Sequence, residues 1–184
     1  SIAGPFSQDH PSGGGGGYLP GGIGWYRKTF AWAQADHDKT VRIEFDGVYK
    51  NCEVWINSHH LGFHPYGYTS FAYELTPHLL PGKNVLAVRV DNSQQPDARW
   101  YSGSGIYRHT WLVLTGPLHV AHWGTYVTTP TVSETSAMVS VRTRIRNAGE
   151  RERTCKLLTE ILDAEGQVVA THVVPPFVDR REAQ

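Results

Sequence analysis

The feature that most constrains the fold is a set of short runs in which apolar and polar residues alternate. In residues 40–45 (TVRIEF) every second side chain is apolar, and residues 51–57 (NCEVWIN) and 139–145 (VSVRTRI) follow the same rule. A period of two residues is that of a β-strand with one buried face, whereas a helix repeats every 3.6 residues. We therefore expect an all-β chain.

Turn signals separate these runs. Asp46-Gly47 and Pro81-Gly82 are typical turn pairs, and further strands are expected at residues 25–30, 61–63, 69–75, 84–90 and 110–114. One helical turn is expected at residues 76–80, with Thr76 as N-cap and Pro77 in the first helical position. Short antiparallel strands at this spacing predict a sandwich or jelly roll, which we place in residues 1–117.

A second domain is expected in residues 118–184. The alternation at 139–145 sets a row of arginines on the other face, which favours a solvated sheet face over an anion site. Residues 155–162 fit a helical stripe and a buried strand equally well; the hairpin they would form with residues 167–170 favours the strand. We predict an immunoglobulin-like β-sandwich. It is truncated, because such domains take about 100 residues, and its last strands are expected outside the chain.

Composition argues against several classes of protein. Seventeen basic residues balance seventeen acidic ones, so the basic excess of a nucleic-acid-binding protein is missing. No apolar run is long enough to span a bilayer, and the close histidine pairs lack the further ligands of a zinc site, so we expect neither membrane nor metal binding. Cys52 and Cys155 fall in different predicted domains, so no disulfide is expected within either.

Two glycine-rich segments invite a functional interpretation. Residues 11–22 (PSGGGGGYLPGG) are not expected to form regular structure, and they read either as a linker or as a loop passing close to a ligand. Residues 99–112 (RWYSGSGIYRHTWL) contain a Gly-x-Gly that could cradle a phosphate. A strand follows it, however, so no helix N-terminus would face the phosphate. The glycines more plausibly let the backbone fold tightly beneath Trp100 and Tyr101.

Four stretches in order, Gly24–Arg27 (GWYR) and residues 42–57, 61–93 and 99–108, resemble glycoside hydrolase family 2, in particular its β-galactosidases. The resemblance covers residues 20–117 and extends more weakly to about residue 174. It implies a jelly-roll sugar-binding domain, an immunoglobulin-like domain and a (β/α)8 barrel with the two catalytic glutamates of a retaining enzyme. The barrel would lie outside this chain, so we expect no catalytic residue here.

The resemblance also implies the site. In family members the loop matching residues 99–112 reaches toward the barrel mouth, and Asp91 aligns with an aspartate that contacts galactose and, in some members, a monovalent cation. Flat aromatic rings fit the C–H faces of sugars, and carboxylates and amides bind their hydroxyls. The candidate sugar-binding residues are Asp91, Asn92, Arg99, Trp100 and Tyr101.

Each of these residues also has a structural interpretation. Asp91 could cap a turn, and Trp100 could pack on its own sheet. Arg108 is expected to fix the loop, Tyr66 and Tyr68 face either the cleft or the core, and Trp25, Trp55 and Trp111 are expected to pack. Gly21 stands where some β-galactosidases have a galactose-contacting asparagine, so a β-glucuronidase- or β-mannosidase-like parent stays open.

Three functions are compatible with these observations. The favoured one is a non-catalytic part of a retaining glycosidase that helps shape the sugar pocket; the others are a stand-alone carbohydrate-binding module and a structural or interaction domain. The expected partners are a β-galactoside or related carbohydrate, the catalytic barrel of the parent chain and a second copy in a homo-oligomer. The chain itself is expected to need no cofactor, although the parent could use a monovalent or divalent cation. Its compartment (periplasmic, secreted or cytoplasmic) stays open.

Overall fold

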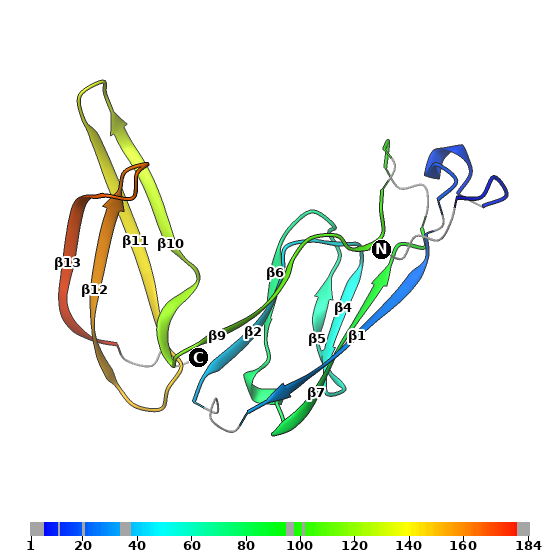
Figure 1. Cartoon of the computed structure of the whole chain (residues 1–184), viewed down its shortest axis with the longest axis horizontal. Coiled ribbons are helices and arrows are strands. Elements are labelled where there is room, and N and C mark those ends of the chain that lie inside the picture. Colours follow the sequence, from blue (N-terminus) through cyan, green and yellow to red (C-terminus); the bar gives the residue numbers. More distant parts are fainter. Residues whose placement is uncertain are drawn as a thin grey trace. The chain divides into compact units, whose positions relative to one another are not determined.

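The structure is a computed structural model that describes residues 6–10, 12–19, 21–33, 38–94, 98–100 and 102–179, with side chains up to residue 175. The chain divides into two compact units, Ser1–Leu114 and Thr115–Gln184. Apart from two short 3-10 turns, the regular elements in the described residues are β-strands (Figure 1). The all-β prediction is confirmed.

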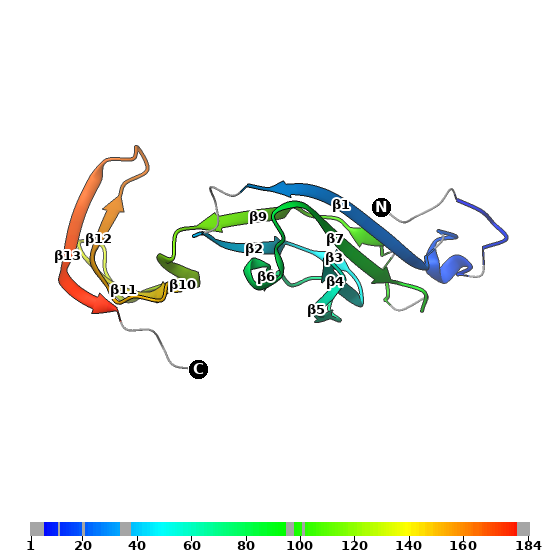
Figure 2. The same ribbon diagram turned by 90° about the horizontal axis from the view of Figure 1, so that it is seen from below.

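Unit 1 (Ser1–Leu114) contains two larger antiparallel sheets and one small one. The four-stranded sheet has the order β1-β7-β4-β5, and the three-stranded sheet has the order β6-β2-β9. In the first, the strands are β1 (Ile23–Trp32), β7 (Gly82–Asp91), β4 (Cys52–Ile56) and β5 (His59–His64). In the second, they are β6 (Phe71–Glu74), β2 (Thr40–Phe45) and β9 (Thr110–Thr115). The short strands β3 (Val48–Tyr49) and β8 (Gly105–Ile106) pair separately. Strand β2 lies beside β6 in both views (Figures 1 and 2).

The core of unit 1 is built by the alternation seen in the sequence. Each strand turns one side chain in two inward, and the inward ones are buried: Val41, Ile43 and Phe45 of β2, Cys52, Val54 and Ile56 of β4, and Leu86, Val88 and Val90 of β7. The Phe45 ring stacks on that of Phe71 with centroids 4.9 Å apart. Burying each large apolar side chain contributes about 1.5–3 kcal/mol, so this core holds the two sheets together.

The expected helical turn forms, with one correction. It is the 3-10 turn η3 (Thr76–His78), with Pro77 in its first turn, but its N-cap is Leu75 and not Thr76. The Thr76 hydroxyl is used elsewhere: it accepts the Val41 N–H (2.9 Å) and donates to the Val41 carbonyl (3.3 Å). Tertiary pairing with β2 has taken the oxygen that a cap would need.

Unit 2 (Thr115–Gln184) consists of two antiparallel hairpins. Strand β10 (Leu118–Val132) pairs with β11 (Ala137–Asn147), and β12 (Arg153–Leu162) pairs with β13 (Val168–Asp179). The ambiguous residues 155–162 are therefore a strand, as predicted. The immunoglobulin-like architecture and the missing last strands stay predictions.

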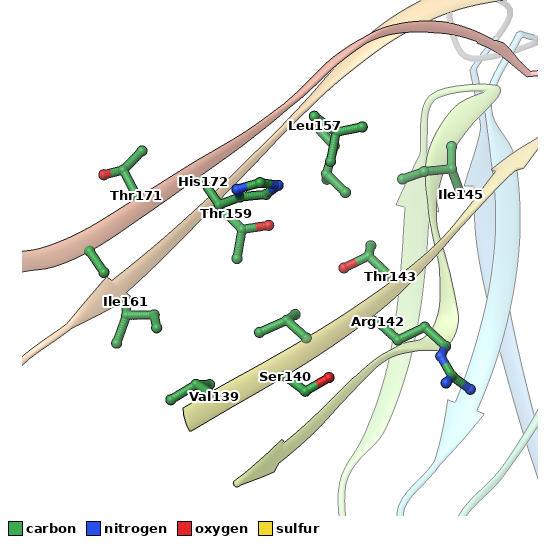
Figure 3. A pocket seen from close by; sticks show the side chains of 13 residues that line it. Val139, Ser140, Arg142, Thr143, Ile145, Leu157, Thr159, Ile161, Thr171 and His172 are labelled. Atoms are coloured by element: carbon green, nitrogen blue, oxygen red, sulfur yellow. The ribbon is translucent and has the colours of Figure 1, made fainter. Parts of the chain in front are cut away.

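An open groove of about 790 Å³ lies between the hairpins of unit 2 (Figure 3). Apolar side chains line it from β11, β12 and β13, among them Val141, Ile145, Leu157, Ile161 and Val174. Burial is incomplete, since Val139 is still 39% exposed. The arginines of β11 (Arg142, Arg144 and Arg146) are exposed, which agrees with a solvated face.

Candidate functional site

The first candidate residue, Asp91, is the last residue of β7. Its backbone N–H donates to the Lys50 carbonyl (3.1 Å), and its carbonyl accepts the Asn51 side-chain amide (3.1 Å). Its carboxylate is held from two sides: Ser93 donates to Oδ1 from its hydroxyl (2.6 Å) and its N–H (3.1 Å), and Arg89 Nη2 donates to Oδ2 (2.7 Å). The group is thus fixed in one orientation, with its side chain about a quarter exposed.

These contacts set the charge of the site. The hydroxyl of Ser93, followed by its backbone N–H and by Arg89, holds the pKa of Asp91 below its usual range, against a smaller opposing effect of burial. Asp91 is therefore a carboxylate at neutral pH, and it can only accept hydrogen bonds. The bond from the Ser93 N–H also closes the turn after β7. Asp91 therefore caps that turn, and its carboxylate is still partly accessible.

Asn92 has a different position from its neighbour. It is fully buried, and its side-chain amide donates to the Ser104 hydroxyl (2.6 Å). Its backbone forms a pair of hydrogen bonds with Gly22, at 2.8 and 3.1 Å. Asn92 therefore ties three segments together: the end of β7, the loop before β8 and the end of the glycine-rich segment.

The described residues of that glycine-rich segment are folded. Gly14–Gly16 form a 3-10 turn, so the expectation of no regular structure was wrong. Ser12 is buried and donates to the Leu19 carbonyl (3.2 Å), and the Phe6 ring meets the Tyr18 ring edge-on with centroids 5.7 Å apart. Together with the pairing of Gly22 and Asn92, these contacts favour a loop beside Asp91 over a linker.

The side chain of Trp100 is 60% exposed. Its indole N–H donates to the Tyr68 hydroxyl (2.8 Å), and the Tyr68 ring packs edge-on against the rings of Tyr49 and Tyr66. Tyr66 and Tyr68 are themselves exposed, so they face solvent beside Trp100 and not the core. The ring of Trp100 is thus held outward by a fixed aromatic neighbour.

The second glycine of the Gly-x-Gly motif, Gly105, is the first residue of β8. Gly105 has φ +103° and is buried where β8 pairs with β3, and the segment continues as a strand. The phosphate-cradle interpretation therefore lacks its helix N-terminus. Beyond it, the Tyr107 hydroxyl donates to the Gly67 carbonyl (2.9 Å), and the Tyr107 ring fills the space that a side chain at Gly47 would need.

Other sequence-based expectations fared unevenly. Arg99 is exposed, Tyr101 lies outside the described residues, and Arg108 is exposed without a hydrogen bond to any described residue, contrary to its expected loop-fixing role. Trp25 and Trp55, which were expected to pack, do so on each other with ring centroids 5.2 Å apart, although Trp25 remains 60% exposed; Trp111 is 51% exposed. Tyr26, Phe30 and Trp32 of β1 pack in or against the core. Because side chains alternate between the two faces of a strand, Trp25 must lie on the outer face, and the sequence could have shown this.

Among the described residues, no group of three or more His, Cys, Asp or Glu side chains is placed to hold a metal ion. In the same part of the chain, no helix is long and apolar enough to cross a membrane. The chemistry that the site offers is recognition: a fixed carboxylate that accepts hydrogen bonds and an aromatic ring held out to solvent.

Residues 19–117 match the family described as "Glycosyl hydrolases family 2, sugar binding domain". The chain belongs to glycoside hydrolase family 2. Unit 1 is accordingly the jelly-roll-like N-terminal sugar-binding domain of that family, as the sequence predicted.

Proteins and solved structures similar to this family 2 chain are several times longer than it. It is 56% identical over 171 residues to beta-galactosidase BoGH2A of Bacteroides ovatus, covering 92% of this chain and 20% of that protein. It is 36% identical to a beta-glucuronidase of Formosa agariphila, covering 81% of this chain and 17% of that protein. The crystal structure of a β-glycosidase from Bacteroides vulgatus is 39% identical, with a TM-score of 0.87, over 96% of this chain and 23% of that one. The chain spans about a fifth of the curated relatives.

Proposed function

We propose that the chain is the non-catalytic sugar-binding part of a retaining β-galactosidase-like enzyme, in which it forms one side of the sugar pocket. The observation that carries this proposal is the outward position of Trp100, fixed by the bond from its indole to Tyr68. An exposed ring in one orientation offers a sugar C–H face contact area at little cost in conformational entropy. Asp91 supplies an anionic acceptor for hydroxyl groups.

The same charge favours a neutral sugar. A glucuronide carries a carboxylate, and a like charge near the ionised Asp91 would oppose its binding. A galactoside carries hydroxyl groups and no charge, and Asp91 can accept hydrogen bonds from those hydroxyl groups. The relatives are named for both activities, so this electrostatic difference, together with the higher identity to a β-galactosidase, is our reason for preferring the galactoside.

The remaining candidate residues take supporting roles in this proposal. Buried Asn92 positions the loop that carries Trp100, through Ser104. Exposed Arg99 extends the sugar-contacting surface beside Trp100, and Tyr101, which lies outside the described residues, is proposed as a further sugar contact from the sequence alone. The catalytic (β/α)8 barrel of a longer polypeptide completes the pocket, and unit 2 is part of an immunoglobulin-like sandwich that orients it.

The test is made in the full-length enzyme with nitrophenyl β-galactoside and nitrophenyl β-glucuronide. We expect Trp100→Ala to raise KM for the galactoside about tenfold, the value of one aromatic contact of roughly 1.4 kcal/mol. Asp91→Asn should weaken galactoside binding. It should also reduce the enzyme's preference for the galactoside over the glucuronide, because the Asp91 charge that repels the glucuronide carboxylate is removed. Trp111→Ala removes an exposed tryptophan of strand β9; it is the matched control and should change neither KM nor kcat.

Three results would contradict the proposal. Unchanged KM and kcat in Trp100→Ala would favour the structural or interaction role. Turnover of the galactoside by the pure 184-residue chain would show that the chain is itself catalytic. Micromolar binding of free galactose by that chain, measured through tryptophan fluorescence, would favour the stand-alone carbohydrate-binding module.

A further inference from the structure

The outer face of the four-stranded sheet, opposite the core, carries side chains that, apart from Asp91, the pocket does not use. Two rows cross all four strands in register. The first row reads Trp25, Arg89, Glu53 and Phe63 from β1 to β5, and the second reads Arg27, Ala87, Trp55 and His60. Aromatic rings and charged groups therefore alternate over a sheet face that the core leaves free.

Three rings from the two rows form a continuous strip. The Trp25 and Trp55 rings have centroids 5.2 Å apart at an interplanar angle of 30°, and the Trp55 and His60 rings have centroids 5.1 Å apart. On β7, which lies between them, Arg89 is in register with Trp25 and Ala87 with Trp55, and the small side chain of Ala87 leaves room for the two rings to meet diagonally across that strand. Trp25 remains 60% exposed, so most of its surface is open to a ligand.

A chain of ion pairs runs beside this strip. Arg89 bonds to Glu53 (2.9 Å) and to Asp91 (2.7 Å), and Glu53 Oε2 lies 3.5 Å from His60 Nε2. The four groups hold one another in place, so a ligand would not have to order them. Guanidinium has five N–H donors and each carboxylate can accept about four hydrogen bonds, so these contacts leave donors and acceptors free.

We propose that this ring strip, Trp25, Trp55 and His60 with the adjoining ion pairs, is a second carbohydrate-binding surface for neutral oligosaccharides. It goes beyond the pocket at Trp100 because it binds the body of a glycan chain and not the terminal sugar. A glycan chain presents C–H faces and hydroxyl groups along its length. The C–H faces can stack on the rings of the strip, while the hydroxyl groups bond to the charged side chains beside it. A nucleic acid would bring its phosphates against Glu53 and Asp91, which argues against stacking of bases here.

The test is a fluorescence titration of the 184-residue chain with two probes, β-1,4-galactotetraose and cellotetraose, and with galactose as the monosaccharide. One of the tetrasaccharides should bind about tenfold or more tightly than galactose, and Trp25→Ala should weaken it by about tenfold, the loss of one aromatic contact. Trp25→Tyr should retain most of the affinity. Trp111→Ala removes a tryptophan that is 51% exposed on another sheet of unit 1, and it should retain all of the affinity.

Further variants separate binding at this strip from a loss of folding and from binding at Trp100. Since Trp25 is on an edge strand and exposed, its substitution should leave the urea midpoint unchanged; Trp55→Phe provides a second, milder change in the strip. The tetrasaccharide titration tests the strip through Trp25, whereas the pocket proposal is judged by the KM of Trp100→Ala in the full-length enzyme. Either proposal can therefore fail alone.

The proposal is overturned if neither tetrasaccharide binds at millimolar concentration, or if Trp25→Ala binds as the wild type does. It is also overturned if sedimentation shows a dimer that Trp25→Ala dissociates and that saccharide leaves intact, because the surface would then be a protein interface.

Discussion

The two units share one sequence pattern and differ in what the pattern buries. In unit 1 the inward residues of β2, β4 and β7 meet across two sheets and lose nearly all exposure. In unit 2, within residues 115–175, Asn147 is the one buried residue, and the apolar faces of β11 and β12 line an open groove. Alternation thus marks which face of a strand is apolar, but burial requires a second apolar layer to close over it.

The largest contrast is expected between the two cysteines, one in each unit. Burial, with a contribution from the Glu53 carboxylate, raises the pKa of the Cys52 thiol to about 12, whereas Cys155 is partly exposed on β12. Because the thiolate is the reactive form, we expect a thiol reagent at pH 8 to label Cys155 at least roughly a thousandfold faster. Mass spectrometry of the labelled chain measures both rates. Similar rates would mean that the core of unit 1 opens readily.

Truncation of core side chains gives the next largest difference. Phe45→Ala removes a stacked, fully buried ring and should lower the free energy of unfolding by about 3–5 kcal/mol. The same truncation in unit 2, Val141→Ala, should cost less than about 1 kcal/mol, since the site is already open. Urea denaturation followed by tryptophan fluorescence and circular dichroism compares the two. If Phe45→Ala does not fold, Ile56→Val provides a smaller change in the same core.

A glycine near the site tests whether the close packing of unit 1 extends to its loops. A Cβ at Gly67 would lie 2.2 Å from Cδ2 of Tyr49, so Gly67→Ala should cost about 1–3 kcal/mol and disturb the bond from Tyr107. At Gly103 a Cβ would meet no atom within 4 Å, and Gly103→Ala should change stability by less than about 0.5 kcal/mol. Equal thermal shifts in the two variants would contradict this packing.

The smallest effect concerns Asp91 and pH. Its pKa is lower in the folded chain than in the unfolded one, so its contribution is complete above the unfolded value, about 4, and is lost as pH falls through the folded value. Between pH 7 and pH 3 the free energy of unfolding should fall further in wild type than in Asp91→Asn. The difference should be about 1 kcal/mol or less, the size of a partly exposed ion pair. Ser93→Ala should reduce this difference. A difference of opposite sign would mean that the carboxylate is destabilising.

Much of unit 1 could be predicted from the sequence because its strands carry their own signals. Alternation placed the buried faces of β2 and β4, and the turn pair Asp46-Gly47 ended β2 where the structure does. Family resemblance, not periodicity, pointed to Asp91 and Trp100.

What could not be predicted depends on contacts between distant residues. Thr76 is a residue type that often caps the N-terminus of a helix, yet its hydroxyl hydrogen-bonds to the backbone of Val41, which is 35 positions away. The bond between Trp100 and Tyr68 joins two loops with no shared pattern, and the burial of Asn92 follows from Ser104 and Gly22. Such partners emerge only when the sheets bring the loops together.

Native-state hydrogen exchange across the whole chain tests the central claim, that unit 1 has a closed core while unit 2 is an open pair of hairpins. We predict that amides of β2, β4 and β7 exchange slowest and that those of β11 and β12 exchange at least about a hundredfold faster. Uniform protection of both units in a monomer would contradict the account.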